Sequence, residues 1–421
     1  MARIKFGTFL APHHPIGESP TLQFHRDLEL ATHLDRLGYD EFWVGEHHST
    51  GWEMIASPEM FLASAAMVTH RIGLGTGVVS LPYHHPFNVA QRMVQLDHIS
   101  RGRALFGSGP GALPSDARTL NIDPMTQRDR QDEALGVIIR LLRGEERFSY
   151  DSDWFTLRDA ALQILPVQEE MPMTTASSIS PSGMTLAGKY GIGALSIAST
   201  SSEGIQALPT QWKFAEDAAA QHGTTVDRKN WRVLMSWHIA ETREQAREEA
   251  INGLHRWHNE YNVGVLGRPG ALRVEDPNVL FEQVAMGGAE GGGAAVIGTP
   301  DDLIAAILGL QGVTGGFGTL LGFANDWADH QATMRSWDMV ARYVIPAVNG
   351  HLRAQQASAE YVGARKGELM AGATAAVMSK IMGHHGAASA MVTTMQQMAA
   401  RAADQENDPV FRPGGGLPTS G

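Results

Sequence analysis

The stretch "EFWVGEHHSTG" (residues 41–51) joins an apolar run to a carboxylate and two adjacent histidines, and a loop containing glycine follows. The same arrangement occurs in "IKFGTFLAPHHP" (residues 4–15) and in "IGLGTGVVSLPYHHP" (residues 72–86). Short apolar runs bounded by Gly and Pro are typical of buried strands. The first three predicted strands therefore each end in a histidine pair.

Strands of this kind alternate with longer segments of helical periodicity along the chain. Eight strand–helix units indicate an α/β protein with the (β/α)₈ TIM-barrel fold. The predicted strands are residues 4–10, 41–45, 72–80, 103–108, 173–177, 194–197, 231–240 and 317–322. The predicted helices are residues 21–37, 58–69, 86–100, 127–143, 182–190, about 203–221, 241–257 and 330–344.

Two regions of the chain are not accounted for by the eight strand–helix units. We therefore expect a barrel over residues 1–350 that contains an insertion and is followed by an extension. The insertion, about residues 258–298, precedes the last strand; its Gly and Pro content suits either a mobile lid or a surface loop. A helix should restart after it, with Thr299 as N-cap and Pro300 in the first turn. Residues 351–421 predict a helical C-terminal extension with a disordered tail, used in oligomer contacts or packed on its own barrel.

Composition limits the classes of function. The chain has 421 residues, a formal net charge of −12 and no cysteine. The negative charge disfavours nucleic acid and anionic membrane surfaces as partners, and the absence of cysteine excludes thiolate catalysis and disulfides. Neither a signal peptide nor a membrane span is recognisable, so we expect a cytoplasmic protein.

The histidine pairs should meet at one end of the barrel, because catalytic groups of this fold lie at the carboxyl ends of its strands. Adjacent residues on an extended chain point to opposite sides, so we expect one working histidine in each pair. A metal site built from Glu46, His47 and His84 is disfavoured, since no HExxH or HxH spacing occurs. For His14, His48 and His85 we expect hydrogen bonds to loops.

Glycine placement favours a cofactor that carries a phosphate. "FGSGPGALPSDA" (residues 106–117) follows the fourth strand, and "ASSISPSGMTLAGKYG" (residues 176–191) runs from the fifth strand into a helix. Free amides and the hydroxyls of Ser180 and Ser182 at a helix start can hold a phosphate without a basic side chain. Arg128, near the start of the fourth helix, is either a further phosphate ligand or an exposed helix charge.

These residues carry a resemblance to the bacterial luciferase-like family of flavin-dependent monooxygenases. The matching stretches are "KFGTFLAPHHP", "LGYDEFWVGEHHSTG", "IGLGTGVVSLPYHHP", "LDHISRGRALFGSGPG", "SPSGMTLAGKYG" and "VIGTPDD", spread over residues 1 to about 345. Within the family, "PSDARTLNIDP", "QRDRQDEAL", "ISPSGMTLAGKYG" and "NDWAD" most resemble the subgroup described as limonene 1,2-monooxygenases.

The resemblance implies a two-component reaction. A separate NAD(P)H-dependent flavin reductase supplies reduced FMN, which reacts with O₂, and one oxygen atom passes to a small apolar substrate, for example a monoterpene such as limonene. The family habit also implies a homodimer. His47 is implied as the catalytic acid or base with a pKa near neutrality, and Glu46 as the residue that orients it or braces the adjacent backbone.

The family's flavin contacts map onto three segments. A non-proline cis peptide under the flavin ring matches Gly77 and Val78, and the loop along the flavin matches Ser108, Gly109 and Pro110. The phosphate-binding helix start matches Ser180, Ser182, Gly183 and Met184. Luciferases have a cysteine and an arginine in the loop and a glutamate at the position of Ile179, so contacts through those side chains are absent here.

Two other functions fit the same barrel. A deazaflavin-dependent oxidoreductase would transfer hydride and need no oxygen, and the site motifs do not separate it from the monooxygenase. A flavin-binding protein without catalysis is disfavoured by the retained His47 and by "GSGPG" (residues 107–111).

Overall fold

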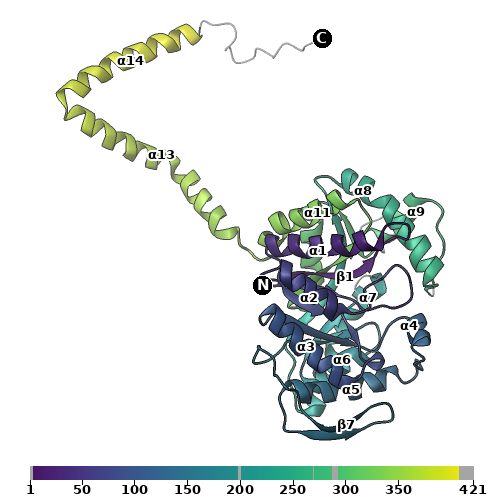
Figure 1. Cartoon of the computed structure of the whole chain (residues 1–421). Coiled ribbons are helices and arrows are strands. Elements are labelled where there is room, and N and C mark those ends of the chain that lie inside the picture. Colours follow the sequence, from purple (N-terminus) through teal and green to yellow (C-terminus); the bar gives the residue numbers. More distant parts are fainter. Residues whose placement is uncertain (1–2, 198–200, 269, 287–292, 407–421) are drawn as a thin grey trace. The chain divides into compact units, whose positions relative to one another are not determined.

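The computed structural model describes residues 3–197, 201–268, 270–286 and 293–406. The chain divides into two compact units, Met1–Gly350 and His351–Gly421. Figure 1 shows a first unit of strands covered by helices and a second unit made of α13 and α14. None of the helices in these described ranges is long and apolar enough to cross a membrane.

The first unit contains a closed barrel of eight parallel strand positions. Strand β10 closes the ring by pairing with β9 on one side and with β12 on the other, and β12 pairs with β1. In ring order the strands are β1 (Lys5–His13), β2 (Glu41–Val44), β3 (Gly73–Thr76) with its continuation β4 (Val79–Ser80), β5 (Ala104–Gly109), β8 (Met173–Ser177), β9 (Gly193–Ser196), β10 (Trp231–Ile239) and β12 (Thr319–Asn325). The predicted TIM barrel is confirmed.

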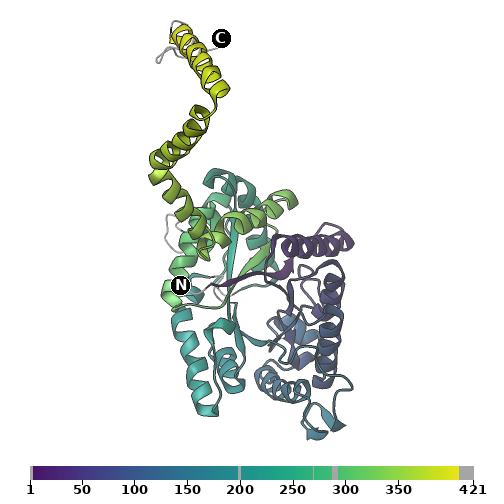
Figure 2. The same ribbon diagram turned by 90° about the vertical axis from the view of Figure 1, so that its left-hand side faces the viewer.

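A helix follows each strand of the ring and lies outside it (Figures 1 and 2). Proline stands in the first turn of several of these helices, where its missing N–H costs no hydrogen bond. The eight helices are α1 (Pro20–Leu37), α2 (Pro58–Val68), α3 (Pro86–Ser100), α5 (Gln127–Leu142), α6 (Ser182–Tyr190), α7 (Ser202–His222), α8 (Arg243–Arg256) and α11 (His330–Met339). Helix α11 continues into a π-helical turn, η5 (Val340–Val344), and the short α12 (Ile345–Val348).

The segment between β10 and β12 is more ordered than a plain loop. It contains a π-helix, η4 (Trp257–Val265), helix α9 (Pro277–Val284), and strand β11 (Ala295–Gly298), which pairs with the end of β10. Helix α10 (Pro300–Thr314) then begins at a capping box between Thr299 and Asp302, which confirms the predicted N-cap. Residues 269 and 287–292 of the predicted insertion lie outside the described residues.

A hairpin after α5 was also missed at the sequence level. Strands β6 (Phe148–Asp151) and β7 (Thr156–Ala160) form an antiparallel hairpin after α5. Glu133 of α5 fastens the hairpin by accepting hydrogen bonds from Ser152 Oγ (2.7 Å) and Trp154 Nε1 (2.7 Å). The two strands are short and half exposed, so their apolar pattern is too weak to predict them.

The barrel interior has a buried ion pair at the amino-terminal end of the strands. Apolar side chains fill the interior from there to the carboxyl end. Glu41 accepts hydrogen bonds from Arg232 Nε (2.7 Å) and Trp43 Nε1 (2.9 Å), and both charged side chains are at most 6% exposed. Burial raises the pKa of Glu41, but the Arg232 guanidinium lowers it more, so the carboxylate stays ionised. The apolar layers above are Phe9, Ala11, Trp43, Leu105, Leu195, Leu234 and Leu321, topped by half-buried Val78, Ile197 and Phe323.

The second unit contains two long helices, α13 (Arg353–Met382) and α14 (His385–Glu406), which confirms a helical C-terminal extension. No side chain of α13 is buried. The tail predicted to be disordered, residues 407–421, lies outside the described residues.

Candidate active site

The predicted catalytic and flavin-contacting residues lie at the carboxyl ends of four neighbouring strands, β2, β3, β5 and β8. Parallel strands place these ends at one mouth of the barrel. Glu46 and His47 follow β2, Gly77–Val78 joins β3 to β4, and Ser108–Pro110 closes β5. The segment with Ser180 and Ser182 connects β8 to α6.

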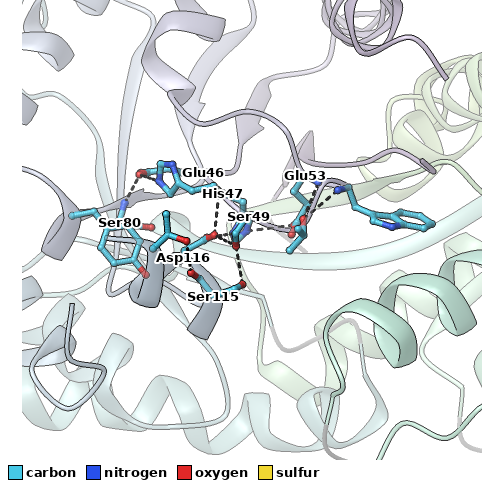
Figure 3. A network of polar contacts seen from close by, with 12 residues as sticks. Glu46, His47, Ser49, Glu53, Ser80, Ser115 and Asp116 are labelled. Carbon is cyan, nitrogen blue, oxygen red and sulfur yellow. Dashed lines mark hydrogen bonds and ion pairs between the residues drawn. The ribbon is translucent and has the colours of Figure 1, made fainter. Parts of the chain in front are cut away.

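Glu46 is a buried acceptor that ties three segments together. Its Oε1 accepts from His48 Nε2 (2.8 Å) and His84 Nε2 (2.7 Å), and its Oε2 accepts from the Ser80 amide (2.8 Å). Burial raises its pKa, but the two histidines and the Ser80 amide together lower it below its ordinary value. Of the two predicted roles, Glu46 therefore braces the backbone beside the Gly77–Val78 peptide and makes no hydrogen bond to His47 (Figure 3).

His47 lies between two other carboxylates (Figure 3). Its Nδ1 is 3.1 Å from Asp116 Oδ2, and its Nε2 is 3.4 Å from Glu53 Oε1. Burial lowers the pKa of His47, but Glu53 and Asp116 together raise it above its ordinary value. Both carboxylates therefore stabilise the imidazolium form of His47.

Asp116 holds the whole His47–Ser49 segment. It comes from α4 (Pro114–Thr119), accepts from the His48 amide (3.0 Å), and bonds the Ser49 hydroxyl. Burial raises its pKa, but the hydrogen bonds from His47 and Ser49 lower it. Sequence reasoning missed this residue, although it lies in the quoted stretch "PSDARTLNIDP".

Glu53 was also missed, and it connects His47 to a second histidine. Its Oε1 accepts from His13 Nε2 (2.9 Å), and Tyr261 of η4 donates its hydroxyl to Oε2. Burial raises the pKa of Glu53, but His13 and His47 lower it to about 2. No sequence motif marks Glu53, which lies in a loop after β2.

The remaining paired histidines have structural partners. His14 lies between Asp326 (Nδ1 to Oδ2, 2.6 Å) and Asp27 (Nε2 to Oδ2, 3.1 Å). Burial lowers the pKa of His14, but the two carboxylates raise it to about 9. His85 accepts from the Phe87 amide (3.3 Å) and caps α3. The expected loop contacts occur through carboxylates: His48 bonds Glu46 and His14 bonds Asp326, both in loops, and His14 also bonds Asp27 of α1.

The predicted flavin contacts begin at the strand ends. The peptide bond between Gly77 and Val78 is cis, as the resemblance implies. A Cβ at Gly109 would lie 2.4 Å from Val78 Cγ2, so only glycine lets β5 approach this peptide so closely. Ser108 is buried and donates its hydroxyl to the Thr174 carbonyl (3.3 Å), while the Pro110 carbonyl accepts from Gln127 Nε2 (2.9 Å).

The predicted phosphate contacts lie at the start of α6. The hydroxyls of Ser180 and Ser182 are 3.0 Å apart, and Ser180 is exposed. The side chain of Met184 is fully buried, and Gly183 has no side chain because a Cβ there would lie 2.1 Å from the Ala176 carbonyl oxygen. Both residues can therefore offer a ligand only their backbone amides. Arg128, in the first turn of α5, is exposed and makes no hydrogen bond or ion pair within the described residues.

Two cavities lie away from this polar network. One of about 810 Å³ has apolar residues of β10, β11, α9 and α10 in its wall, such as Met235, Phe281, Val296 and Leu310, and also charged side chains, such as Arg243 and Arg247 of α8. Another of about 930 Å³ lies between α5, α6 and the β6–β7 hairpin. Across the described ranges no group of three or more His, Asp or Glu side chains has the arrangement of a metal site.

Comparison with known proteins gives consistent matches. A model of the luciferase-like monooxygenase family matches residues 4–315. A 4-hydroxyprotoasukamycin monooxygenase from Streptomyces nodosus subsp. asukaensis is 48% identical over 366 residues, which cover 86% of this chain and 97% of that protein. A limonene 1,2-monooxygenase from Rhodococcus erythropolis is 48% identical over 352 residues, which cover 83% and 88%.

A solved structure shares the fold. The oxygenating constituent of 3,6-diketocamphane monooxygenase from Pseudomonas putida, in complex with FMN, aligns with a TM-score of 0.69 at 24% sequence identity. The alignment covers 82% of this chain and 99% of that chain.

Proposed function

The chain belongs to the luciferase-like monooxygenase family, and from this premise we propose that it is a flavin-dependent monooxygenase. It uses reduced FMN and O₂ to transfer one oxygen atom to a small apolar organic substrate such as a monoterpene. A separate NAD(P)H-dependent reductase supplies the reduced FMN, and the working form is a homodimer. Reduced FMN supplies the electrons: substrate, O₂, the anion of reduced FMN and one proton give oxygenated product, oxidised FMN and water.

The barrel mouth fits a flat aromatic cofactor. The top layer of the interior is formed by Val78, Ile197 and Phe323, which are apolar and only half-buried. Beside it, the cis peptide and Gly109 allow a close backbone approach. These residues would hold the ring on an apolar surface and exclude water from one of its faces.

The start of α6 fits the phosphate end of FMN. The first amides of a helix lack intrahelical acceptors and carry a partial positive charge. Ser180 and Ser182 add two hydroxyls at this point. Together they would bind a dianion without a basic side chain. Arg128 would add a positive charge from the neighbouring α5.

His47 is our choice for the group that supplies the proton. Asp116 fixes its ring through Nδ1, and Nε2 makes only the 3.4 Å contact to Glu53 within the described residues. The proton on Nε2 is therefore the one available at the barrel mouth. Because both carboxylates stabilise the imidazolium, His47 acts as an acid that returns to its charged form after each turnover.

The observation that carries the proposal is that this histidine, the cis Gly77–Val78 peptide, the loop at Gly109 and the hydroxyl-bearing helix start follow four neighbouring strands. The test uses purified protein, chemically reduced FMN and limonene in an oxygen electrode, with product and hydrogen peroxide quantified. We expect oxygen consumption coupled to an oxygenated product. A protein that retains a deazaflavin, or that consumes no oxygen with reduced FMN and forms product anaerobically, would contradict the proposal.

A further inference from the structure

A cavity of about 310 Å³ lies behind the barrel mouth, between the ends of β1 and β12 and helices α1 and α11. Its wall includes the polar side chains of His13, His14, Asn325 and Asp326. On its rim Glu18 has a side chain that is 56% exposed, which opens the cavity to solvent. A cavity of about 310 Å³ has room for about ten waters at the roughly 30 Å³ that a water takes in the liquid, and its polar side chains can bind them.

His13 forms the wall between this cavity and the active site. Its Nε2 bonds Glu53, whereas its Nδ1 is buried and has no hydrogen-bond partner among the described residues. The ring is 5% exposed and packs against Tyr261 (4.6 Å between centroids) and Phe323 (5.1 Å). A buried ring nitrogen without a protein partner costs free energy unless water binds it, and the adjacent cavity offers that water.

We propose that Glu53 and His13 carry a proton between this cavity and His47. The proposal rests on the proposed function, since oxygen transfer with release of water consumes a proton at the mouth. A proton from bulk solvent passes through cavity water to His13 Nδ1, the proton on His13 Nε2 passes to Glu53 Oε1, and that oxygen passes it to His47 Nε2. His13 is then protonated on Nδ1 and returns to its starting tautomer by exchange with water before the next turnover. Only N–H and O–H bonds form or break. Both residues act through His47 and touch no substrate.

Other groups around the relay keep its direction fixed. Asp116 occupies Nδ1 of His47, so the proton can arrive only at Nε2. Tyr261 occupies Oε2 of Glu53, so both histidines share Oε1. Around His13 the other facing groups are the uncharged rings of Trp257, Tyr261 and Phe323. The low pKa of Glu53 means that the carboxylate releases the proton rather than keeping it.

The first test needs no flavin. In protein with ¹⁵N-labelled histidine, NMR measures how fast the His47 Nε2 proton exchanges with water. His13→Phe keeps a packed aromatic ring but removes both nitrogens, and we expect it to slow this exchange by about 10-fold or more. His85→Phe is the control, because it removes a half-buried histidine that caps α3 and lies outside the relay. Equal exchange in wild type and His13→Phe would overturn the proposal, since the proton would then enter from the mouth.

A second variant, His13→Ala, distinguishes loss of the relay from a folding defect, and product formation is measured beside the exchange rate. His13→Ala leaves a hole beside the cavity, and added imidazole should restore both the exchange rate and product formation. Product formation with reduced FMN should fall about 10-fold or more in His13→Phe while FMN affinity is unchanged. If wild type makes no product but the exchange effect is present, the relay stands and the monooxygenase proposal fails. If wild type makes product and both His13 variants match it, the relay is wrong.

Discussion

Replacing Asp116 with asparagine tests whether the structure holds His47 as a cation. Asparagine keeps the oxygen that accepts from the His48 amide (3.0 Å) but removes the charge that faces His47 Nδ1 at 3.1 Å. A hydrogen bond to a charged group is worth about 1.5–3 kcal/mol and a neutral one about 0.5–1.5 kcal/mol. We therefore expect Asp116→Asn to lower the free energy of unfolding by about 1–2 kcal/mol where both groups are ionised.

The pH dependence gives this prediction its sign. The raised pKa of His47 contributes stability that is fully present below its unfolded value, about 6.5, and is lost as pH rises through the folded pKa. The lowered pKa of Asp116 contributes stability that is lost as pH falls through its folded value. The loss in the variant should therefore be largest near pH 5.5 and smaller at pH 9.

Urea unfolding followed by tryptophan fluorescence at the two pH values measures the effect. Asp129→Asn, an exposed acid in the first turn of α5, is the control for losing one negative charge. An equal loss at pH 5.5 and pH 9, or no loss at pH 5.5, would refute the reasoning, because His47 would then not be held as a cation by Asp116.

Three further changes test other parts of the site and its support. Ser182→Asp puts a negative charge at the start of α6 and should weaken binding of reduced FMN by about 10-fold or more, as measured by fluorescence titration, whereas unchanged affinity would move the phosphate elsewhere. Glu46→Gln leaves His48 and His84 without their shared carboxylate and should lower the free energy of unfolding in urea by about 1–3 kcal/mol near neutral pH, a loss that should shrink on acidification because the pKa of Glu46 is lowered. Glu41→Gln breaks the buried ion pair with Arg232 and should lower the free energy of unfolding in urea by about 3–5 kcal/mol without changing FMN affinity. A loss below about 1 kcal/mol would contradict the stabilising role of this ion pair.

The sequence by itself determined the barrel and the positions of its functional segments. Apolar runs and helical periodicity are local properties, so alternating patterns predict eight strand–helix units without knowledge of contacts. The ends of the strands follow from the same patterns, which is why "EFWVGEHHSTG" already places Glu46 and His47 at the mouth. Chemistry confined to short stretches, such as the cap at Thr299, was also readable.

Only the tertiary structure decided which groups these residues meet. Asp116 lies 69 positions from His47, and Tyr261 lies 208 positions from Glu53, so no periodicity links them. Closing the ring brings such distant loops to one mouth, and a side chain there binds whichever opposite charge the closure presents. For that reason Glu46, adjacent to His47 in sequence, binds His48 and His84 instead, while His47 is held by Asp116 and Glu53.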